Sequence, residues 1–377
     1  MLIPKCVLRL KRPFFASLCG RGRIPAIIAA AALTLGMVTQ SGVRAQSGDD
    51  IHMPSFGDSR LLSACFSPSA LKGQRGEIKP VKGVRTFDAT TAARTLAAHS
   101  PIPAGLSGAI RRVNVRNGAK LIALTLDLCE QTGEIAGYDG PIIDYLRENQ
   151  IKATLFTGGK WMRSHELRIQ QLMADPLFEI GNHGEAHRNL RLLSPRALGA
   201  EIEGPQRAYE AAREGFAKEQ CVGNVPGGLS TVPPRMGLFR FPFGACNAQS
   251  LNAVNAAGLL AIQWDISTGD PDPNTSAKAI VNTVMRKVKP GSIIIGHANG
   301  RGHHTAAALS QLIPKLRAQG YKFVTVSELL AAGTPEIVPT CYDSRPGDTD
   351  RYDRLPFQKR ATTATARPAA GAGAADR

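Results

Sequence analysis

Two histidines four residues apart, His183 and His187, have the spacing in this chain that points most directly to chemistry. On a helical turn this spacing puts both imidazoles on one face, where neutral rings can bind one divalent cation. Pairs of surface histidines share the same spacing, so the motif alone decides little. Its context favours a metal site, because the motif follows an apolar run at residues 177–180 that predicts a buried strand.

Ionisable side chains and Gly/Pro turns also follow four other apolar runs. These are Asp127 after residues 121–126, Arg240-Phe241-Pro242-Phe243-Gly244 after 238–239, Asp265 and Asp270 after 259–264, and His297 after 292–295. In a parallel barrel the chemistry sits at the carboxyl ends of the strands, so we expect these groups to meet there. Beside two histidine ligands, Asp127 and His297 would place a base and an acid around a Lewis acid.

Short apolar runs alternate with amphipathic stretches through the middle of the chain. The predicted strands are residues 121–126, 153–157, 177–180, 238–241, 259–264, 292–295 and 322–325. The predicted helices are residues 141–149, 165–174, a long helix after Ser194, 250–256, 277–288 and 305–318. This alternation predicts an α/β fold, an irregular or incomplete (β/α) barrel of about seven parallel strands. A doubly wound open sheet is the alternative.

The two ends of the chain differ in composition from the middle. Residues 1–45 hold seven basic residues and no acidic one, and an apolar run at 24–38 precedes Val43-Arg44-Ala45, a small-x-small cleavage pattern. This predicts a secretory signal peptide cleaved after Ala45. The alternative is a membrane anchor, but the apolar run is short beside the roughly 20 residues that a bilayer span needs. We expect an N-terminal extension at 46–117, a catalytic domain at 118–333 and a disordered tail at 343–377.

Export of the mature protein would place it in a periplasm, on a cell wall or outside the cell, with no stable membrane span. The net charge of +16 falls to +9 when the seven cations of the signal segment are subtracted. Such a charge suits anionic cell-wall polymers or lipid surfaces as well as plain solubility. No basic run with interleaved aromatic residues indicates a nucleic-acid partner. Nothing in the sequence fixes the number of subunits.

Five cysteines follow the signal segment, an odd number that leaves at least one outside any intrachain disulfide: Cys65, Cys129, Cys221, Cys246 and Cys341. Cys65 with Cys341 would tie together the ends of the domain. Cys129 with Cys246 would join two motifs beside the site, and Cys221 with Cys246 is the competing pair. An exported protein permits such bonds.

The motifs together, in their order along the chain, resemble the polysaccharide deacetylase family, also called the NodB homology domain. The resemblance covers residues of about 120–330 and rests on Thr125 to Cys129, His183 to His187, Arg240 to Gly244, Trp264-Asp265 with Asp270, and Ile293 to His297. It implies a metal-assisted hydrolase that removes N-acetyl groups from an exported or cell-wall glycan. An O-acetyl esterase and a non-catalytic glycan-binding protein are the alternatives.

The resemblance also implies a role for each matched residue. Asp127 would be the general base, His297 the general acid, and Arg240 the group that orients Asp127. Asp265 would hold or tune this charged set, and the turn at Pro242 and Phe243 would provide a backbone N–H for the oxyanion. His183 and His187 would bind the metal, zinc or cobalt.

One departure from the family pattern concerns the metal. The family has a third ligand, an aspartate, at the position of Leu128, which cannot ligate. Glu130 and Asp139 are equal candidates to replace it, and Cys129 is another if it is not in a disulfide. A second departure is Gly184, where the family usually has serine or threonine.

Overall fold

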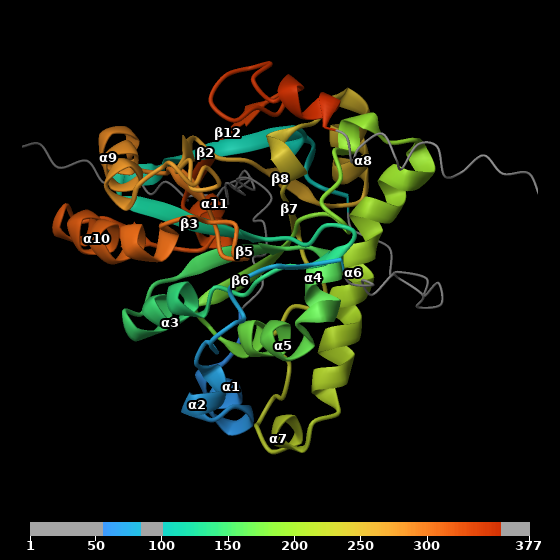
Figure 1. The fold of residues 1–377 in the computed structure, drawn as a ribbon, viewed down its shortest axis with the longest axis vertical. Helices are drawn as coiled ribbons and strands as arrows, with labels where there is room; N and C mark the ends of the chain where they lie inside the picture. Colours follow the sequence, from blue (N-terminus) through green and yellow to red (C-terminus); the bar gives the residue numbers. More distant parts are fainter. Residues whose placement is uncertain (1–55, 84–100, 356–377) are drawn as a thin grey trace, which may run out of the picture. The chain divides into compact units, whose positions relative to one another are not determined.

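A computed structural model describes residues 56–83 and 101–355. The predicted signal peptide lies outside these residues, as does the predicted tail from residue 356 onward. In the described part the chain forms a ten-stranded sheet with helices around it (Figure 1). Within these ranges no helix combines the length and the apolar character needed to cross a membrane.

The strands of the large sheet alternate along the chain with helices. Its strands are β2 (Ala109–Val115), β3 (Leu121–Leu128), β5 (Ala153–Thr157), β6 (Phe178–Asn182), β7 (Leu238–Phe239), β8 (Leu260–Ile262), β9 (Ile266–Ser267), β10 (Ile293–His297), β11 (Lys322–Phe323) and β12 (Gly333–Val338). A separate antiparallel pair joins β1 (Val81–Lys82) to β4 (Glu134–Ile135). Every predicted strand is present, so the alternation of apolar runs identified these strands of the sheet correctly.

The strand order shows that the sheet curls. It runs β12-β2-β8-β7-β6-β5-β3-β10-β9, with β11 beside β3, and all pairings except β12 with β2 are parallel. Only residues 263–265 separate β8 from β9, yet β8 pairs with β7 and β9 pairs with β10 at the other end of the order. The sheet must therefore bend round until its far strands come close. The predicted incomplete barrel is confirmed, and the open doubly wound sheet is excluded.

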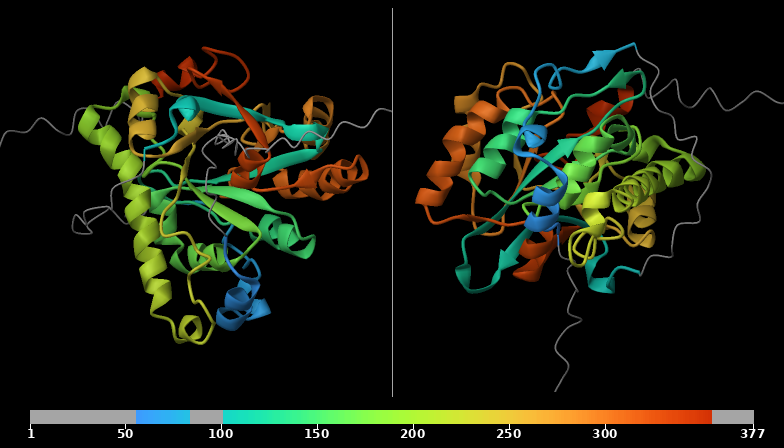
Figure 2. Two further views of the ribbon diagram at one scale, coloured as in Figure 1. Left: turned by 180° about the vertical axis from the view of Figure 1, so that it is seen from behind. Right: turned by 90° about the horizontal axis from the view of Figure 1, so that it is seen from below.

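Helices surround this sheet (Figure 2). They are α1 (Ser59–Cys65), α2 (Pro68–Leu71), α3 (Gly140–Glu148), α4 (Gly159–Ser164), α5 (Glu166–Ala174), α6 (Pro195–Ala217), α7 (Gln220–Gly223), α8 (Ala248–Ala256), α9 (Ala277–Lys287), α10 (Thr305–Ala318) and α11 (Val326–Ala331). Helix α9 illustrates how the local sequence favours a helix. Ser276 caps its first turn, Ile280 and Val284 are buried, and Arg286 and Lys287 lie at its carboxyl end, where the helix dipole favours cations.

The barrel extends beyond the boundaries predicted for it. Strand β2 lies in the predicted extension, and β12 continues past residue 333. Sequence reasoning missed β2 because Arg111 and Arg112 interrupt its apolar pattern. In the fold Arg112 pairs with Glu336 of β12, and Arg111 donates to the carbonyls of Tyr342 and Asp343. The disordered tail predicted from 343 is therefore wrong for residues 343–355, which are folded and include a 3-10 turn at Asp350–Arg354.

Two disulfides join Cys65 to Cys221 and Cys246 to Cys341, while Cys129 is free and buried. All three predicted pairings are wrong. The first bond links α1 to α7, which lie side by side although 156 residues separate the cysteines (Figure 1). The second joins the end of the 240–244 motif to the segment after β12. Such long separations leave no local trace in the sequence.

Candidate active site

The register of the sheet brings the predicted residues to one edge. His297, the last residue of β10, is the direct partner of Asp127 near the end of β3. Across the next strands Thr157 pairs with Asn182, and Asn182 pairs with Phe239. Because Thr157 is the partner of Leu128, the residues that follow these last two, His183 and Arg240, lie level with Cys129, two residues past Asp127. Adjacent strand ends thus converge as the apolar runs predicted.

Arg240 is wholly buried and holds Asp127. Its Nη1 donates to Asp127 Oδ1 at 3.0 Å and to Thr125 Oγ1 at 2.7 Å. The guanidinium carbon lies 4.0 Å from the centre of the Phe156 ring. Stacking on this ring fixes the orientation of the planar Arg240 guanidinium, and the hydrogen bond from the guanidinium then fixes the Asp127 carboxylate as well.

His297 is paired with Asp270. Its Nδ1 lies 2.9 Å from Asp270 Oδ1, and its backbone N–H donates to Asp270 Oδ2 at 2.8 Å. Burial alone would lower the pKa of His297, but the charge and hydrogen bond of Asp270 outweigh it and raise that pKa above its ordinary value. The proton on this histidine is therefore retained to a higher pH.

Asp265 does not join this charged set. Its carboxylate accepts from Ser292 Oγ at 2.9 Å and from the backbone N–H of Ile293 at 2.8 Å. The aspartate that contacts the acid is Asp270 instead. Both follow the same apolar run, and only the turn between them decides which carboxylate reaches His297.

The two histidines and Cys129 form one compact group. Their ligating atoms all lie within 4.8 Å of one another. His183 Nδ1 lies 2.9 Å from the carbonyl of Arg240, so this nitrogen carries the hydrogen and Nε2 presents a lone pair. Burial lowers the pKa of His183 and takes that of His187 well below its ordinary value. Neutral imidazoles are the form that binds a metal.

The site fits a divalent cation. His183 Nε2 and His187 Nδ1 are buried without a hydrogen-bond partner among the described residues. His183 Nε2 also lies 3.3 Å from Asp127 Oδ2, which sets a lone pair against a carboxylate oxygen. Unpartnered buried polar atoms are costly, by about 1–3 kcal/mol each, and a cation removes that cost. The geometry of the donors is thus what a metal site requires.

Neither carboxylate predicted as the third ligand belongs to this group. Glu130 Oε2 accepts from the backbone N–H of Ala136 at 3.1 Å and from Ser164 Oγ at 2.6 Å. Asp139 lies at the start of α3, where burial raises its pKa to about 6. Leu128 is part of the hydrophobic core. The prediction of Glu130 or Asp139 as the third ligand is not supported, and among the described residues the third member of the group that could hold a metal is Cys129.

His187 and Phe243 both have left-handed backbones. Their φ angles are 52° and 62°, and their ring centres lie 4.4 Å apart in an edge-to-face arrangement. Such a backbone costs a non-glycine residue on the order of 1–3 kcal/mol, and such strain clusters at active sites. Phe243 belongs to a 3-10 turn with Pro242, which is buried, and Gly244.

A cavity of about 640 Å³ opens over these groups. Its lining includes Asp127, Cys129, His187, Phe243, Trp264, Asp270 and His297. His183 and Arg240 lie behind this surface, in contact with Asp127. Most of the predicted site residues thus line one cavity or support it.

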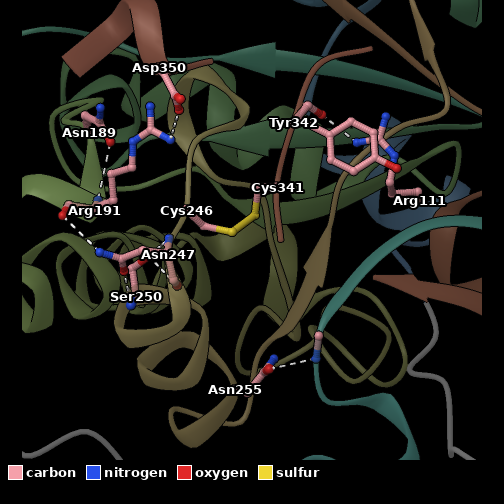
Figure 3. The surroundings of a disulfide bond; sticks show 11 residues. Arg111, Asn189, Arg191, Cys246, Asn247, Ser250, Asn255, Cys341, Tyr342 and Asp350 are labelled. Atoms are coloured by element: carbon pink, nitrogen blue, oxygen red, sulfur yellow. Dashed lines mark hydrogen bonds and ion pairs between the residues drawn. A yellow bond between two sulfur atoms is a disulfide. The ribbon is translucent and has the colours of Figure 1, made fainter. Parts of the chain in front are cut away.

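The segment after β12 forms part of the cavity wall. This C-terminal strap, residues 341–355, contributes Asp343, Arg351 and Tyr352 to the lining. Figure 3 shows how it is fastened: Cys341 is bonded to Cys246, Tyr342 packs against Arg111, and Asp350 pairs with Arg191. Sequence analysis missed the strap, because a polar stretch after the last apolar run gave no signal.

A sequence model of the polysaccharide deacetylase family matches residues 114–262. A peptidoglycan-N-acetylglucosamine deacetylase of Bacillus cereus is 30% identical over 218 residues, which are 57% of this chain and 91% of that protein. This chain belongs to the polysaccharide deacetylase family. The membership predicted from the ordered motifs is confirmed.

A chitooligosaccharide deacetylase relative agrees with this assignment. A chitooligosaccharide deacetylase of Rhizobium leguminosarum bv. phaseoli is 29% identical over 197 residues, 47% of this chain and 78% of that protein. Among solved structures, a CE4 family pseudoenzyme from Bacillus anthracis is 25% identical with a TM-score of 0.48, and the match covers 59% of this chain and 69% of that one.

Proposed function

We propose that this chain is an exported, metal-assisted hydrolase that removes N-acetyl groups from amino-sugar polysaccharides or oligosaccharides. The proposal rests above all on one pairing at the cavity: Asp127, a carboxylate held by a buried arginine, and His297, a histidine backed by a buried carboxylate. A protein that only bound glycans would have no use for an acid and a base. The names of the two deacetylase relatives support an amino-sugar substrate.

The proposed steps balance the protons of amide hydrolysis. Asp127 takes a proton from the attacking water, with Oδ2 available because Arg240 engages Oδ1. The water oxygen bonds to the acetyl carbon, and the C–N bond then breaks. His297 gives its proton to the leaving nitrogen from Nε2, since Nδ1 is engaged by Asp270. The products are acetate and a free amino sugar.

Two further groups stabilise charge in this proposal. A divalent cation at His183 and His187, with zinc and cobalt as candidates, would polarise the acetyl carbonyl and acidify the attacking water. The backbone N–H of Phe243, in the turn with Pro242, is assigned to the developing oxyanion. Both act on charge that appears only as the reaction proceeds.

Two structural disulfides support export. Cys65–Cys221 and Cys246–Cys341 are bonds that persist in oxidising compartments and are rare in the cytosol of ordinary cells. They agree with the signal peptide predicted at residues 1–45. A periplasm, a cell wall and the medium outside the cell are all consistent with this.

The test is acetate release by the mature protein from N-acetylglucosamine oligomers and from peptidoglycan, with zinc or cobalt supplied. We expect activity from the wild type and a loss of at least about 100-fold in Asp127→Asn. Asp265→Asn is the matched control, because this aspartate also follows a strand of the sheet, but its carboxylate accepts hydrogen bonds from Ser292 and Ile293 and not from Arg240 or His297. No acetate from any glycan, or full activity in Asp127→Asn, would refute the proposal.

A further inference from the structure

Cys129 differs from the other cysteines that the structure describes. Cys65, Cys221, Cys246 and Cys341 form disulfides, whereas Cys129 is free and only 2% exposed. It lies one residue past the end of β3 and lines the same cavity as Asp127. A free thiol that lines the cavity of the candidate active site is therefore a candidate for a role in that site.

The surroundings of Cys129 point to a cation. Its Sγ lies within 4.8 Å of ligating nitrogens of His183 and His187. His183 is 1% exposed, and its Nε2 has no hydrogen-bond partner among the described residues. Because the carbonyl of Arg240 fixes the hydrogen on Nδ1, that Nε2 presents a lone pair to the space it shares with the sulfur. Three donor atoms thus converge on one point.

The sulfur also has a partner of the kind that supports a ligand. Asn299, which is fully buried, donates from Nδ2 to Cys129 Sγ at 3.2 Å and to the Cys129 carbonyl at 2.8 Å. These two bonds hold the cysteine in one orientation. Hydrogen bonds of this type position metal ligands and tune their basicity.

We propose that Cys129, as a thiolate, is the third protein ligand of the divalent cation bound by His183 and His187. On binding, the S–H bond breaks, a sulfur–metal bond forms, and the proton passes to solvent. A set of one thiolate and two imidazoles selects zinc or cobalt over magnesium and calcium, which prefer oxygen ligands. Three protein ligands leave a fourth position open, as a catalytic site needs. This inference rests on the proposed function only for what the bound metal does in the reaction, and not for the binding of the metal itself.

Cobalt substitution provides a readout that does not depend on activity. A thiolate bound to Co²⁺ gives a strong near-ultraviolet charge-transfer absorption that nitrogen and oxygen ligands do not give. The full mature protein is stripped with a chelator and titrated with Co²⁺ and then Zn²⁺, while the bound metal is counted by elemental analysis. We expect one ion per chain and the sulfur-to-cobalt band in the wild type.

Two variants test the contribution of the Cys129 sulfur to metal binding. Cys129→Ser should lose the band and bind zinc at least about tenfold more weakly. Mutation of a residue that only supports a metal ligand already lowers metal affinity by about 10- to 100-fold, so loss of a ligand should cost at least as much. Cys129→Asp supplies a carboxylate, so it should bind metal without the band. Circular dichroism of each variant confirms folding. A wild type that binds cobalt without the band, or a folded Cys129→Ser with unchanged affinity, would overturn the assignment.

Acetate release measured on the same samples separates this inference from the proposed function. A wild type that binds cobalt through sulfur but cleaves no glycan would sink the proposed function alone. A wild type that releases acetate while Cys129→Ser binds zinc equally well would sink the ligand assignment alone.

Discussion

Asp270 engages His297 at two points, the imidazole Nδ1 through Oδ1 and the backbone N–H through Oδ2. Thr305 also donates from Oγ1 to Oδ2 at 2.7 Å, so both oxygens of this buried carboxylate are occupied. The imidazole is therefore fixed in position, and its protonation is coupled to one neighbour. In the proposed reaction His297 holds a proton until the C–N bond breaks, so this coupling would set the pH range of that reaction.

Asp270→Asn should shift the alkaline limb of the activity profile. In the proposed reaction His297 is the acid and acts when protonated, so activity should fall as pH rises through its pKa. Asp270 raises that pKa, and its removal should move the fall in kcat/KM to lower pH. The pH profile of kcat/KM on an N-acetylglucosamine oligomer measures the shift.

The control for this variant is Asp272→Asn, on the same loop and at the rim of the cavity, where its carboxylate accepts from Asn274. The alkaline limb of the Asp272→Asn profile should lie at the same pH as that of the wild type. An Asp270→Asn profile that falls at the wild-type pH, with only a lower plateau, would contradict the coupling.

His297→Ala should separate two kinds of acetyl bond. An amine is a poor leaving group and needs the proton that His297 supplies, whereas an alcohol leaves with less help. Truncation should therefore reduce cleavage of an N-acetyl amide much more than that of an activated acetate ester. Parallel assays on the two substrates give the ratio of losses, and equal losses would remove His297 from the role of acid.

The buried carboxylate of Glu179 predicts a pH effect on stability. It accepts from Thr154 Oγ1 at 2.8 Å and from the backbone N–H of Ser327 at 3.1 Å, and burial raises its pKa from 4.5 to about 7. The fold favours the protonated form, so the stability it contributes is present below pH 4.5 and is lost as pH rises through 7. The loss is on the order of 3 kcal/mol.

Urea unfolding between pH 4.5 and pH 8 tests this expectation. The Glu179→Gln variant should show a flatter dependence of unfolding free energy on pH than the wild type. Glu203→Gln, which removes a surface ion pair with Arg207, should leave the wild-type dependence unchanged. An equal pH dependence in the Glu179 variant and the wild type would mean that Glu179 does not titrate in this range.

The residues of the candidate site were predictable where each directly follows an apolar run. Asp127, Arg240 and His297 each follow an apolar run directly, and a parallel sheet gathers the ends of such runs at one edge. The choice between Asp265 and Asp270 was not predictable, because both follow one run and the intervening turn decides which faces His297.

Pairings between residues that lie far apart in the chain could not be predicted from the sequence. The two disulfides span 156 and 95 residues, and nothing near either cysteine marks its partner. Strand β2 was hidden because Arg111 and Arg112 look like surface residues until their partners in β12 and the strap are known. The barrel could thus be predicted from its interior strands, but its outermost strands could not.

The bond between Cys246 and Cys341 should matter for substrate binding as well as for stability. It fastens the strap, which carries Tyr352 and Asp343 into the cavity wall, to the chain just past the turn at Phe243. Replacing both cysteines by serine should cost about 2–5 kcal/mol and raise KM for glycan oligomers more than it lowers kcat. The matched control removes Cys65–Cys221, which joins α1 to α7 and contributes nothing to the cavity lining. That variant should lose stability with KM unchanged, and an equal rise in KM in both double variants would show that the strap has no particular part in binding.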